Sequence, residues 1–475
     1  MFARLTGRPA LLLLFFVACG EESPSKIPEG NTGGSGSPAN SAGAFSAGSG
    51  GTPGASGTGT GAPGGAPSLA GQGGAPPAGG NNAGPGGTPQ GGASPTAGSG
   101  GQSGGTSGGA PGTAGSAPGG KGDPGGGAGG PPIPRPGKTY VYVGTGDWGK
   151  SGGGKIRTYA LDDVSLTLTS SGSTDAGTLP SFFTVNPAGT ALYAGDEEAG
   201  GVRAFSIAAS GQLSALNTQS SSGKPVYLST DREARFLFTA HYNEGSVQVF
   251  GLSNNGQLSA SVQSLSTGSQ AHSILVSPDG KHVFVPNKGS NYIAQFKLES
   301  DGKLTPNTPP NVSSSGGPRH LTFHPSKPFA YVAHENSNTL RAFSYDGASG
   351  VLTEIDSENM LPSGVGNSTA ADVRVEPTGK FVYASNRANA DSSLAIFSIN
   401  QTDGTLSLVG HAATHGNTPR NFGIHPAGRI LLVANQDSNN VAAFRLDPDT
   451  GALTFVATTD VGDKAWCVGF VVKPE

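Results

Sequence analysis

The chain has 475 residues and a formal net charge of −4, and it contains 80 glycines and 36 prolines. Its length would allow two or three ordinary domains, but so much glycine and proline means that a large part of it cannot build a hydrophobic core. No run of lysine and arginine occurs anywhere in the sequence, so we expect no nucleic acid among its partners.

The first segment has the pattern of an export signal. Arg4 and Arg8 precede the apolar run at residues 10–16, which is too short to cross a bilayer as a stable helix. The following FVAC resembles a bacterial lipobox, whose cysteine is acylated and becomes the new N-terminus. We therefore expect a signal peptide at residues 1–19 and a lipid anchor on Cys19 in a bacterial membrane. Gly20 is not the Asp that retains many such lipoproteins at the inner membrane, which favours the outer membrane. An ordinary signal peptide cut elsewhere is the alternative.

Residues 20–137 form the next predicted region, a linker that from Asn31 to about Pro134 is made almost wholly of Gly, Ser, Ala, Pro, Thr, Asn and Gln. A segment with so little apolar surface cannot offset the entropy of ordering its backbone, so we expect it to be disordered. A Gly-rich coil of this length has a root-mean-square span of about 60 Å. Such a linker would let the rest of the chain stand well clear of a membrane.

The remaining region, residues 138–475, repeats one unit: an apolar strand, a turn such as SPDGK, a second apolar strand and a polar loop. One position of the second strand recurs every 45 to 52 residues, at Tyr193, Phe238, Phe284, Tyr331, Tyr383 and Leu432. A third strand and a short fourth strand follow in each unit. This period with four antiparallel strands per unit predicts a β-propeller.

A seventh unit is split between the two ends of this region. YVYVGTG and KIRTYAL, at residues 140–146 and 155–161, lack a preceding first strand, and AWCVGF, at residues 465–470, lacks the strands that should follow. We expect the C-terminal strand to lie innermost in the blade begun by the N-terminal strands. This closure leaves no open edge in the ring. The predicted fold is therefore an all-β, seven-bladed propeller of four-stranded antiparallel blades.

Polar residues cluster at two places in the repeat, the start of the first strand and the end of the second. In antiparallel neighbours these two places lie at the same end of the blade, around the central funnel. Six side chains are expected there: His272, Arg319, Arg420, Glu335, Arg387 and Gln436. His241 and His334 are second-rank candidates at the ends of second strands. His324 and His425 are expected to serve turns, and His282 and His411 to lie at the surface.

A histidine, a glutamate and several arginines in one funnel could bind an anionic or carbonyl-rich substrate and transfer protons. Arginine forks match carboxylates or phosphates and can also stabilise an oxyanion. The plainer alternative is that these charges only pair across blades. No HExxH, CxxC or Asp-rich calcium loop indicates a metal, no phosphate-binding loop indicates a nucleotide cofactor, and no GxSxG elbow indicates a serine hydrolase.

Three segments of the propeller carry a family resemblance: GGPRHLTFHPSKPFAYVAHENSNTL, ADVRVEPTGKFVYASNRANADSSLAIF and TPRNFGIHPAGRILLVANQDSNNVAAF. They resemble the propeller-type 6-phosphogluconolactonase family, which includes a carboxymuconate cyclase, and the resemblance extends over about residues 138–470. It implies a metal-free, cofactor-free lactonase whose catalytic set falls here on His272, Arg319, Glu335 and Arg387. We also expect the neighbouring Arg420, Gln436, His320 and Asn421 to bind substrate. One departure is the segment VPNKGSN, where the family commonly has VPDLG, so that Asn287 and Lys288 are unusual.

The resemblance and the export signal together predict a lactone hydrolase outside the cytoplasm. Its substrate would be a sugar lactone or a related lactone, and its product the hydroxy acid. Because 6-phosphogluconolactone is made in the cytoplasm, a lactone without phosphate fits an exported protein better. The alternative function is a non-catalytic propeller that binds a glycan or a protein partner at the cell envelope, since one fold carries many functions.

Overall fold

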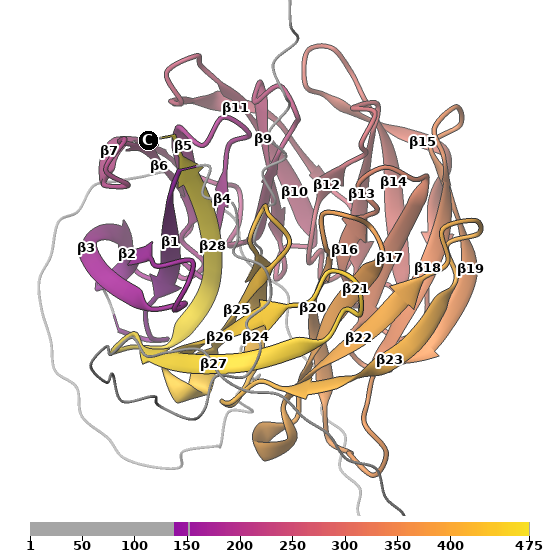
Figure 1. Cartoon of the computed structure of the whole chain (residues 1–475). Coiled ribbons are helices and arrows are strands. Elements are labelled where there is room, and N and C mark those ends of the chain that lie inside the picture. Colours follow the sequence, from indigo (N-terminus) through magenta and orange to yellow (C-terminus); the bar gives the residue numbers. More distant parts are fainter. Residues whose placement is uncertain (1–136, 151–152, 475) are drawn as a thin grey trace, which may run out of the picture. The chain divides into compact units, whose positions relative to one another are not determined.

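A computed structural model describes residues 137–150 and 153–474. These residues form seven four-stranded antiparallel sheets arranged around a central axis, which confirms the predicted seven-bladed propeller (Figure 1). The predicted signal peptide at 1–19, with Cys19, and all of the predicted linker except Gly137 lie outside the described residues. Within the described part of the chain, no helix is long and apolar enough to cross a membrane.

Blade 1 contains the strands from both ends of the propeller, in the order β28-β1-β2-β3, and blades 2 to 7 each contain four consecutive strands. The innermost strands, in blade order, are β28 (Ala465–Lys473), β4 (Phe182–Val185), β8 (Pro225–Thr230), β12 (Leu275–Val276), β16 (Pro318–Phe323), β20 (Thr369–Val375) and β24 (Pro419–Ile424). The second strands are β1 (Lys138–Thr145), β5 (Ala191–Gly195), β9 (Phe236–His241), β13 (His282–Asn287), β17 (Phe329–His334), β21 (Phe381–Arg387) and β25 (Ile430–Asn435).

The outer halves of the blades face solvent along much of their length. The third strands are β2 (Gly154–Leu161), β6 (Val202–Ile207), β10 (Ser246–Leu252), β14 (Tyr292–Leu298), β18 (Thr339–Asp346), β22 (Ser393–Ile399) and β26 (Asn440–Leu446). The fourth strands are β3 (Leu168–Gly177), β7 (Leu213–Gln219), β11 (Leu258–Ser266), β15 (Leu304–Ser313), β19 (Val351–Asn359), β23 (Leu406–Ala413) and β27 (Leu453–Asp460). Two short 3-10 turns, η1 (Asn389–Asp391) and η2 (Gln436–Ser438), follow β21 and β25.

The split blade closes as the sequence predicts. The C-terminal strand β28 pairs antiparallel with β1 along its whole length, from Lys138 opposite Lys473 to Thr145 opposite Ala465. In Figure 1 the yellow β28 lies beside the dark purple β1. The two ends of the propeller therefore complete one sheet, and no blade is left with an open inner edge.

The core lies between blades and is built from the residue that marks the repeat. Tyr193, Tyr331 and Tyr383 are completely or almost completely buried. The Tyr331 hydroxyl donates to the Gly404 carbonyl of the next blade at 3.1 Å, and the Tyr383 hydroxyl donates to Gly451 at 2.8 Å. The Tyr331 and Tyr383 rings therefore pack as apolar residues and also satisfy their hydroxyls across the blade boundary.

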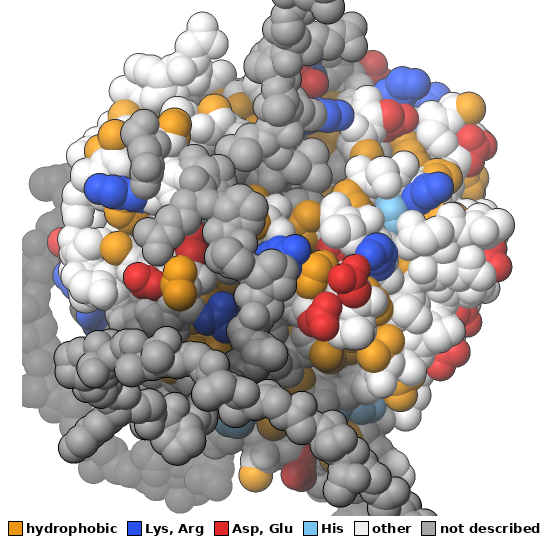
Figure 2. Space-filling model, in the orientation of Figure 1, with side chains coloured by type: hydrophobic (Ala, Val, Ile, Leu, Met, Phe, Trp, Pro, Cys, Tyr) orange, Lys and Arg blue, Asp and Glu red, His pale blue; other side chains and the backbone are white. Residues whose placement is uncertain are grey.

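Charged side chains of both signs are interspersed on the outer surface that Figure 2 shows, outside the grey region. They alternate with apolar and uncharged polar side chains, and no broad patch of one charge stands out there. A group of buried charged residues lies on the inner strands, at Arg319, Asp372 and Arg420, and at the ends of the second strands, at Lys288 and Glu335.

Candidate functional site

Two arginines reach the centre of the ring because the inner strands bulge. In β16, Pro318 pairs with His334 and His320 pairs with Ala333, so Arg319 is an extra residue between two paired positions. The same shift occurs in β24 around Arg420. A β-bulge re-aims the side chain of the extra residue, and both arginines are fully buried.

Glu335, directly after β17, forms ion pairs with cationic side chains from three blades. Its carboxylate lies 2.8 Å from Arg319 Nε, 3.1 Å from Arg387 Nη2 and 2.9 Å from Lys288 Nζ. Glu335, Arg319 and Lys288 are each at most 5% exposed. The structure thus brings together three of the four predicted catalytic residues, and it adds Lys288 to them.

His272, the fourth predicted catalytic residue, lies beside this group without a hydrogen bond to it. Its ring packs edge to face against Tyr242 and His320, with centroids 5.4 and 5.2 Å away. The side chain is fully buried, and among the described residues neither ring nitrogen has a hydrogen-bond partner. We call His272, Lys288, Arg319, Glu335 and Arg387 the funnel cluster.

The other predicted binding residues form two neighbouring groups. Arg420 Nη1 donates to Gln436 Oε1 at 3.2 Å, and the Arg420 guanidinium lies over the Trp466 ring at 4.8 Å. His320 and Asn421 both contact the buried carboxylate of Asp372, through His320 Nδ1 at 2.9 Å and Asn421 Nδ2 at 2.7 Å. His320 Nε2 also lies 3.1 Å from Arg319 Nη1, which joins this second group to the funnel cluster.

Burial and charge set the protonation states in the funnel cluster. Burial alone would raise the pKa of Glu335, but Arg387, Arg319 and Lys288 together hold it far below its usual range. Burial lowers the pKa of His272 well below 6.5, and the charge of Arg319 lowers it further. Burial also lowers the pKa of Arg319 to about 9, helped by Arg387 and opposed by Glu335. At neutral pH the cluster therefore holds a carboxylate, a neutral imidazole and cationic partners.

Sequence reasoning did not select three residues of this region: Lys288 entered only as an unusual feature, and Tyr242 and Asp372 did not enter at all. Lys288 and Tyr242 occupy the same position in the repeat as Glu335 and Arg387, one residue after the His or Asn near the end of the second strand. This shared position in the repeat is the sequence feature that could have identified Lys288 and Tyr242 as site residues. Asp372 occupies the same position of its inner strand as His320 and Asn421 do in theirs, but its contacts with those two residues cross between blades and leave no signal in the sequence.

The remaining histidines serve the fold. His241 bonds Thr239 and Ser246 of its own blade. His334 bonds Val332 of its own strand and Ser314, which follows the last strand of the preceding blade, so both second-rank candidates are held by groups of the fold. His324 Nδ1 accepts from the turn amides of Ser326 and Lys327, as expected. The expectation for His282 was wrong, because it is 5% exposed and bonds the Tyr345 hydroxyl of the next blade at 2.8 Å.

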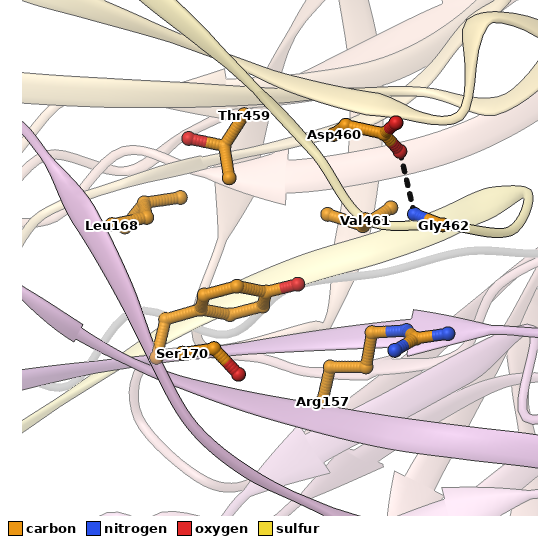
Figure 3. Close-up of a pocket in the computed structure, with 8 residues that line it drawn as sticks. Arg157, Leu168, Ser170, Thr459, Asp460, Val461 and Gly462 are labelled. Atoms are coloured by element: carbon orange, nitrogen blue, oxygen red, sulfur yellow. Dashed lines mark hydrogen bonds between the residues drawn. The ribbon is translucent and has the colours of Figure 1, made fainter.

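A separate cleft lies on the outer strands, between blade 1 and the end of β27 (Figure 3). Arg157 and Tyr159 line it from β2, and Thr459 and Asp460 line it from β27. None of the predicted site residues borders this cleft. Among residues 137–150 and 153–474, no group of three or more His, Cys, Asp or Glu side chains is arranged to hold a metal ion.

Comparison with known proteins agrees with this architecture. Residues 140–470 match the family model described as "Lactonase, 7-bladed beta-propeller". The chain is 32% identical over 292 residues to a 6-phosphogluconolactonase of Serratia proteamaculans, covering 61% of this chain and 87% of that protein. It is also 32% identical over 294 residues to a 6-phosphogluconolactonase of Formosa agariphila, covering 58% and 83% respectively.

A solved structure gives a similar result over the whole propeller. The periplasmic gluconolactonase of Pseudomonas aeruginosa superposes with a TM-score of 0.65 at 27% identity, and the match covers 71% of this chain and all of that chain. The family model spans more than half of the chain and coincides with the seven blades. The chain therefore belongs to the lactonase family of seven-bladed β-propellers.

Proposed function

We propose that this propeller hydrolyses a sugar lactone, or a related lactone, to the open hydroxy acid without a metal ion. The observation that carries this proposal is the funnel cluster: the buried, neutral imidazole of His272 interacts electrostatically with Arg319 and with the Glu335 carboxylate, which forms ion pairs with two guanidinium groups. The relatives named 6-phosphogluconolactonase and the periplasmic gluconolactonase support the reaction class.

His272 is the better candidate for the general base. Three cations hold the carboxylate of Glu335 in its charged state and make it a poor proton acceptor. The imidazole of His272 is neutral and has no hydrogen-bond partner among the described residues, so its nitrogens can receive a proton. An anionic group bound next to Arg319 would offset one of the charges that lower the pKa of His272, and so strengthen the base.

The reaction needs one proton to leave water and one to reach the leaving oxygen. Water attacks the lactone carbonyl carbon as His272 takes its proton, and the carbonyl oxygen gains the negative charge. Arg319 and Arg387 provide planar donors that are cationic at neutral pH for that oxyanion and for the product carboxylate. When the ring C–O bond breaks, His272 returns the proton to the departing alkoxide, which becomes the hydroxyl of the product. Glu335 keeps the two guanidinium groups in place.

The proposal can be tested with the purified propeller and a panel of sugar lactones, with and without a phosphate group, by following acid release. We expect turnover of at least one lactone, and no loss of turnover after treatment with EDTA. His272→Gln should lower kcat by about 10²- to 10⁴-fold, the usual contribution of a positioned base. Hydrolysis that persists unchanged in His272→Gln would exclude this histidine as the base. No turnover together with tight glycan or protein binding would support the binding-module alternative.

We also propose that the protein acts outside the cytoplasm as a lipoprotein anchored through Cys19. The lipobox-like sequence supports this proposal, and the periplasmic location of the Pseudomonas aeruginosa relative agrees with export. Cys19→Ser should move the full-length protein from the membrane fraction to the soluble fraction. Unchanged fractionation of that variant would rule out the lipid anchor.

A further inference from the structure

Arg319, whose Nε contacts Glu335, also contacts a buried imidazole–carboxylate pair, His320 and Asp372, through Nη1. We propose that His320 and Asp372 are positioning residues: they fix the plane of the Arg319 guanidinium so that it is aligned with the oxyanion of lactone hydrolysis. This inference rests on the proposed function for its catalytic consequence. It assigns His320 to Arg319 instead of to direct substrate binding.

The hydrogen-bond directions from Arg319 through His320 to Asp372 follow from which atoms can donate. Arg319 Nη1 lies 3.1 Å from His320 Nε2, and a guanidinium nitrogen can only donate. Nε2 must therefore accept and carry no proton. The ring proton then lies on Nδ1, which donates to Asp372 Oδ1 at 2.9 Å. The pair of contacts selects one neutral tautomer of His320, and burial keeps the pKa of His320 well below 6.5.

Asp372 is itself held firmly by groups from neighbouring strands. Its Oδ2 accepts from Asn421 Nδ2 at 2.7 Å and from Arg374 Nε at 3.1 Å, and its Oδ1 accepts from the Val373 amide at 2.9 Å. The side chains of Asp372, His320 and Asn421 are at most 1% exposed and come from three adjacent blades. The carboxylate is thus a fixed point against which His320 is oriented.

Arg319 is held in turn along its planar fork. Nε contacts Glu335 Oε2 at 2.8 Å, and Nη1 donates to the Ala371 carbonyl at 2.9 Å as well as to His320. Because the guanidinium is planar, contacts at Nε and Nη1 define both its position and its tilt. A misplacement of about 1 Å at a reacting group can lower the rate about 10²-fold, so restraining the Arg319 guanidinium would increase the rate of hydrolysis.

A hydrogen bond that only joins two blades does not require an ionisable histidine–aspartate pair. Ser273 occupies the position of His320 in the preceding blade, and its hydroxyl joins the two blades by donating to the Arg319 backbone carbonyl at 2.9 Å. In contrast, His320 accepts a hydrogen bond from the Arg319 side chain and is itself bonded to Asp372. Because this histidine–aspartate pair contacts a guanidinium group and not only the backbone, it favours a role in positioning Arg319 over a role in holding the blades together.

A matched pair of substitutions separates the two contacts of His320. His320→Asn keeps an amide donor at the depth of Nδ1, facing Asp372, but removes the acceptor for Arg319. His320→Gln places an amide oxygen at the depth of Nε2, where it can accept from Arg319. With the most active lactone, we expect His320→Asn to lower kcat by about 10²-fold and to change KM by less than about threefold, because the Arg319 charge remains. His320→Gln should recover most of that loss at an unchanged melting temperature.

A double-mutant cycle and a spectroscopic measurement complete the test. If His320 acts through Arg319, the effects of His320→Asn and Arg319→Lys on kcat should be clearly less than additive. In histidine labelled with ¹⁵N, the His320 signal should report the Nδ1–H tautomer. The Arg319 Nε signal should shift in His320→Asn and return in His320→Gln. Additive effects, an Nε2–H tautomer or an unchanged kcat in His320→Asn would each overturn the proposal. If the wild-type protein hydrolyses no lactone, the proposed function fails, whereas the tautomer and the Arg319 signal still decide the positioning claim.

Discussion

Glu335 illustrates how a residue of this funnel can be needed for stability as well as chemistry. Its single negative charge is shared by Arg319, Arg387 and Lys288 in a region from which water is largely excluded. Removing one member of a buried ion group leaves the others uncompensated, which costs far more than an exposed pair. The carboxylate therefore both orients the arginines and neutralises them.

This view predicts that Glu335→Gln destabilises the propeller by about 3–5 kcal/mol, because two buried cations and the partly buried Arg387 lose their anion. Lys288→Met removes only one of those cations and should have a much smaller effect. The double variant should be more stable than Glu335→Gln alone. Urea denaturation of the three variants at pH 7 measures these differences. A Glu335→Gln variant as stable as the wild type would mean that the charges are not buried together in solution.

At the level of the strand, two successive positions at the end of each second strand have different tasks. The first position bonds groups of the fold: His241 bonds Ser246 of its own blade, whereas His334, Asn386 and Asn435 bond Ser314, Met360 and Thr414, which follow the last strand of the preceding blade. The second position supplies Tyr242, Lys288, Glu335, Arg387 and Gln436 to the centre. Alternation along a strand explains why neighbours in sequence serve fold and function separately.

The histidines at the first position should make the propeller sensitive to acid. Burial lowers the pKa of His241 to about 4 and that of His334 to about 3, below the ordinary value of 6.5. A group whose pKa is lower in the folded state stabilises the fold above pH 6.5, and this contribution is lost as pH falls toward the folded value. Each pH unit in that interval costs up to about 1.4 kcal/mol per histidine.

Asparagine fills this position in three other blades, as Asn287, Asn386 and Asn435. His241→Asn/His334→Asn should therefore fold and lose less stability than the wild type between pH 7 and pH 4.5. Unfolding in urea at the two pH values gives the comparison, and His411→Asn on an outer strand serves as the control. Equal losses in the double variant and the wild type would show that other groups cause the acid sensitivity.

At the scale of the whole molecule, closure of the ring depends on β28. This strand forms the inner edge of blade 1 and carries Trp466, on which the Arg420 guanidinium lies. The Trp466 indole also donates to the Gly146 carbonyl at 2.9 Å, joining the last strand to the loop after the first. Closure and the edge of the candidate site therefore rest on the same strand.

Deleting residues 464–475 should abolish cooperative folding of the whole propeller, because blade 1 loses its inner strand and blade 7 loses its neighbour. Removing only residues 474 and 475 should leave the melting temperature unchanged. Circular dichroism and calorimetry on the two truncations provide the measurement. A longer deletion that melted like the wild type would show that the ring does not need β28.

The sequence by itself determined the architecture. The recurring aromatic position, the complementary half-units at 140–161 and 465–470, and the polar ends of strands were enough to predict seven blades, their closure and a central cluster of His, Glu and Arg. These features are readable because alternation within a strand and the period of the repeat are local properties. The family resemblance then narrowed the chemistry to lactones.

Only the tertiary structure decided which polar residues meet. Asp372 joins His320 to Asn421 across three blades, Lys288 reaches Glu335 from the preceding blade, and His282 is buried by Tyr345 of the next blade. These contacts depend on bulges in the inner strands and on how far each blade is turned against its neighbour. No period in the sequence encodes that angle, because it results from packing between sheets that lie far apart along the chain.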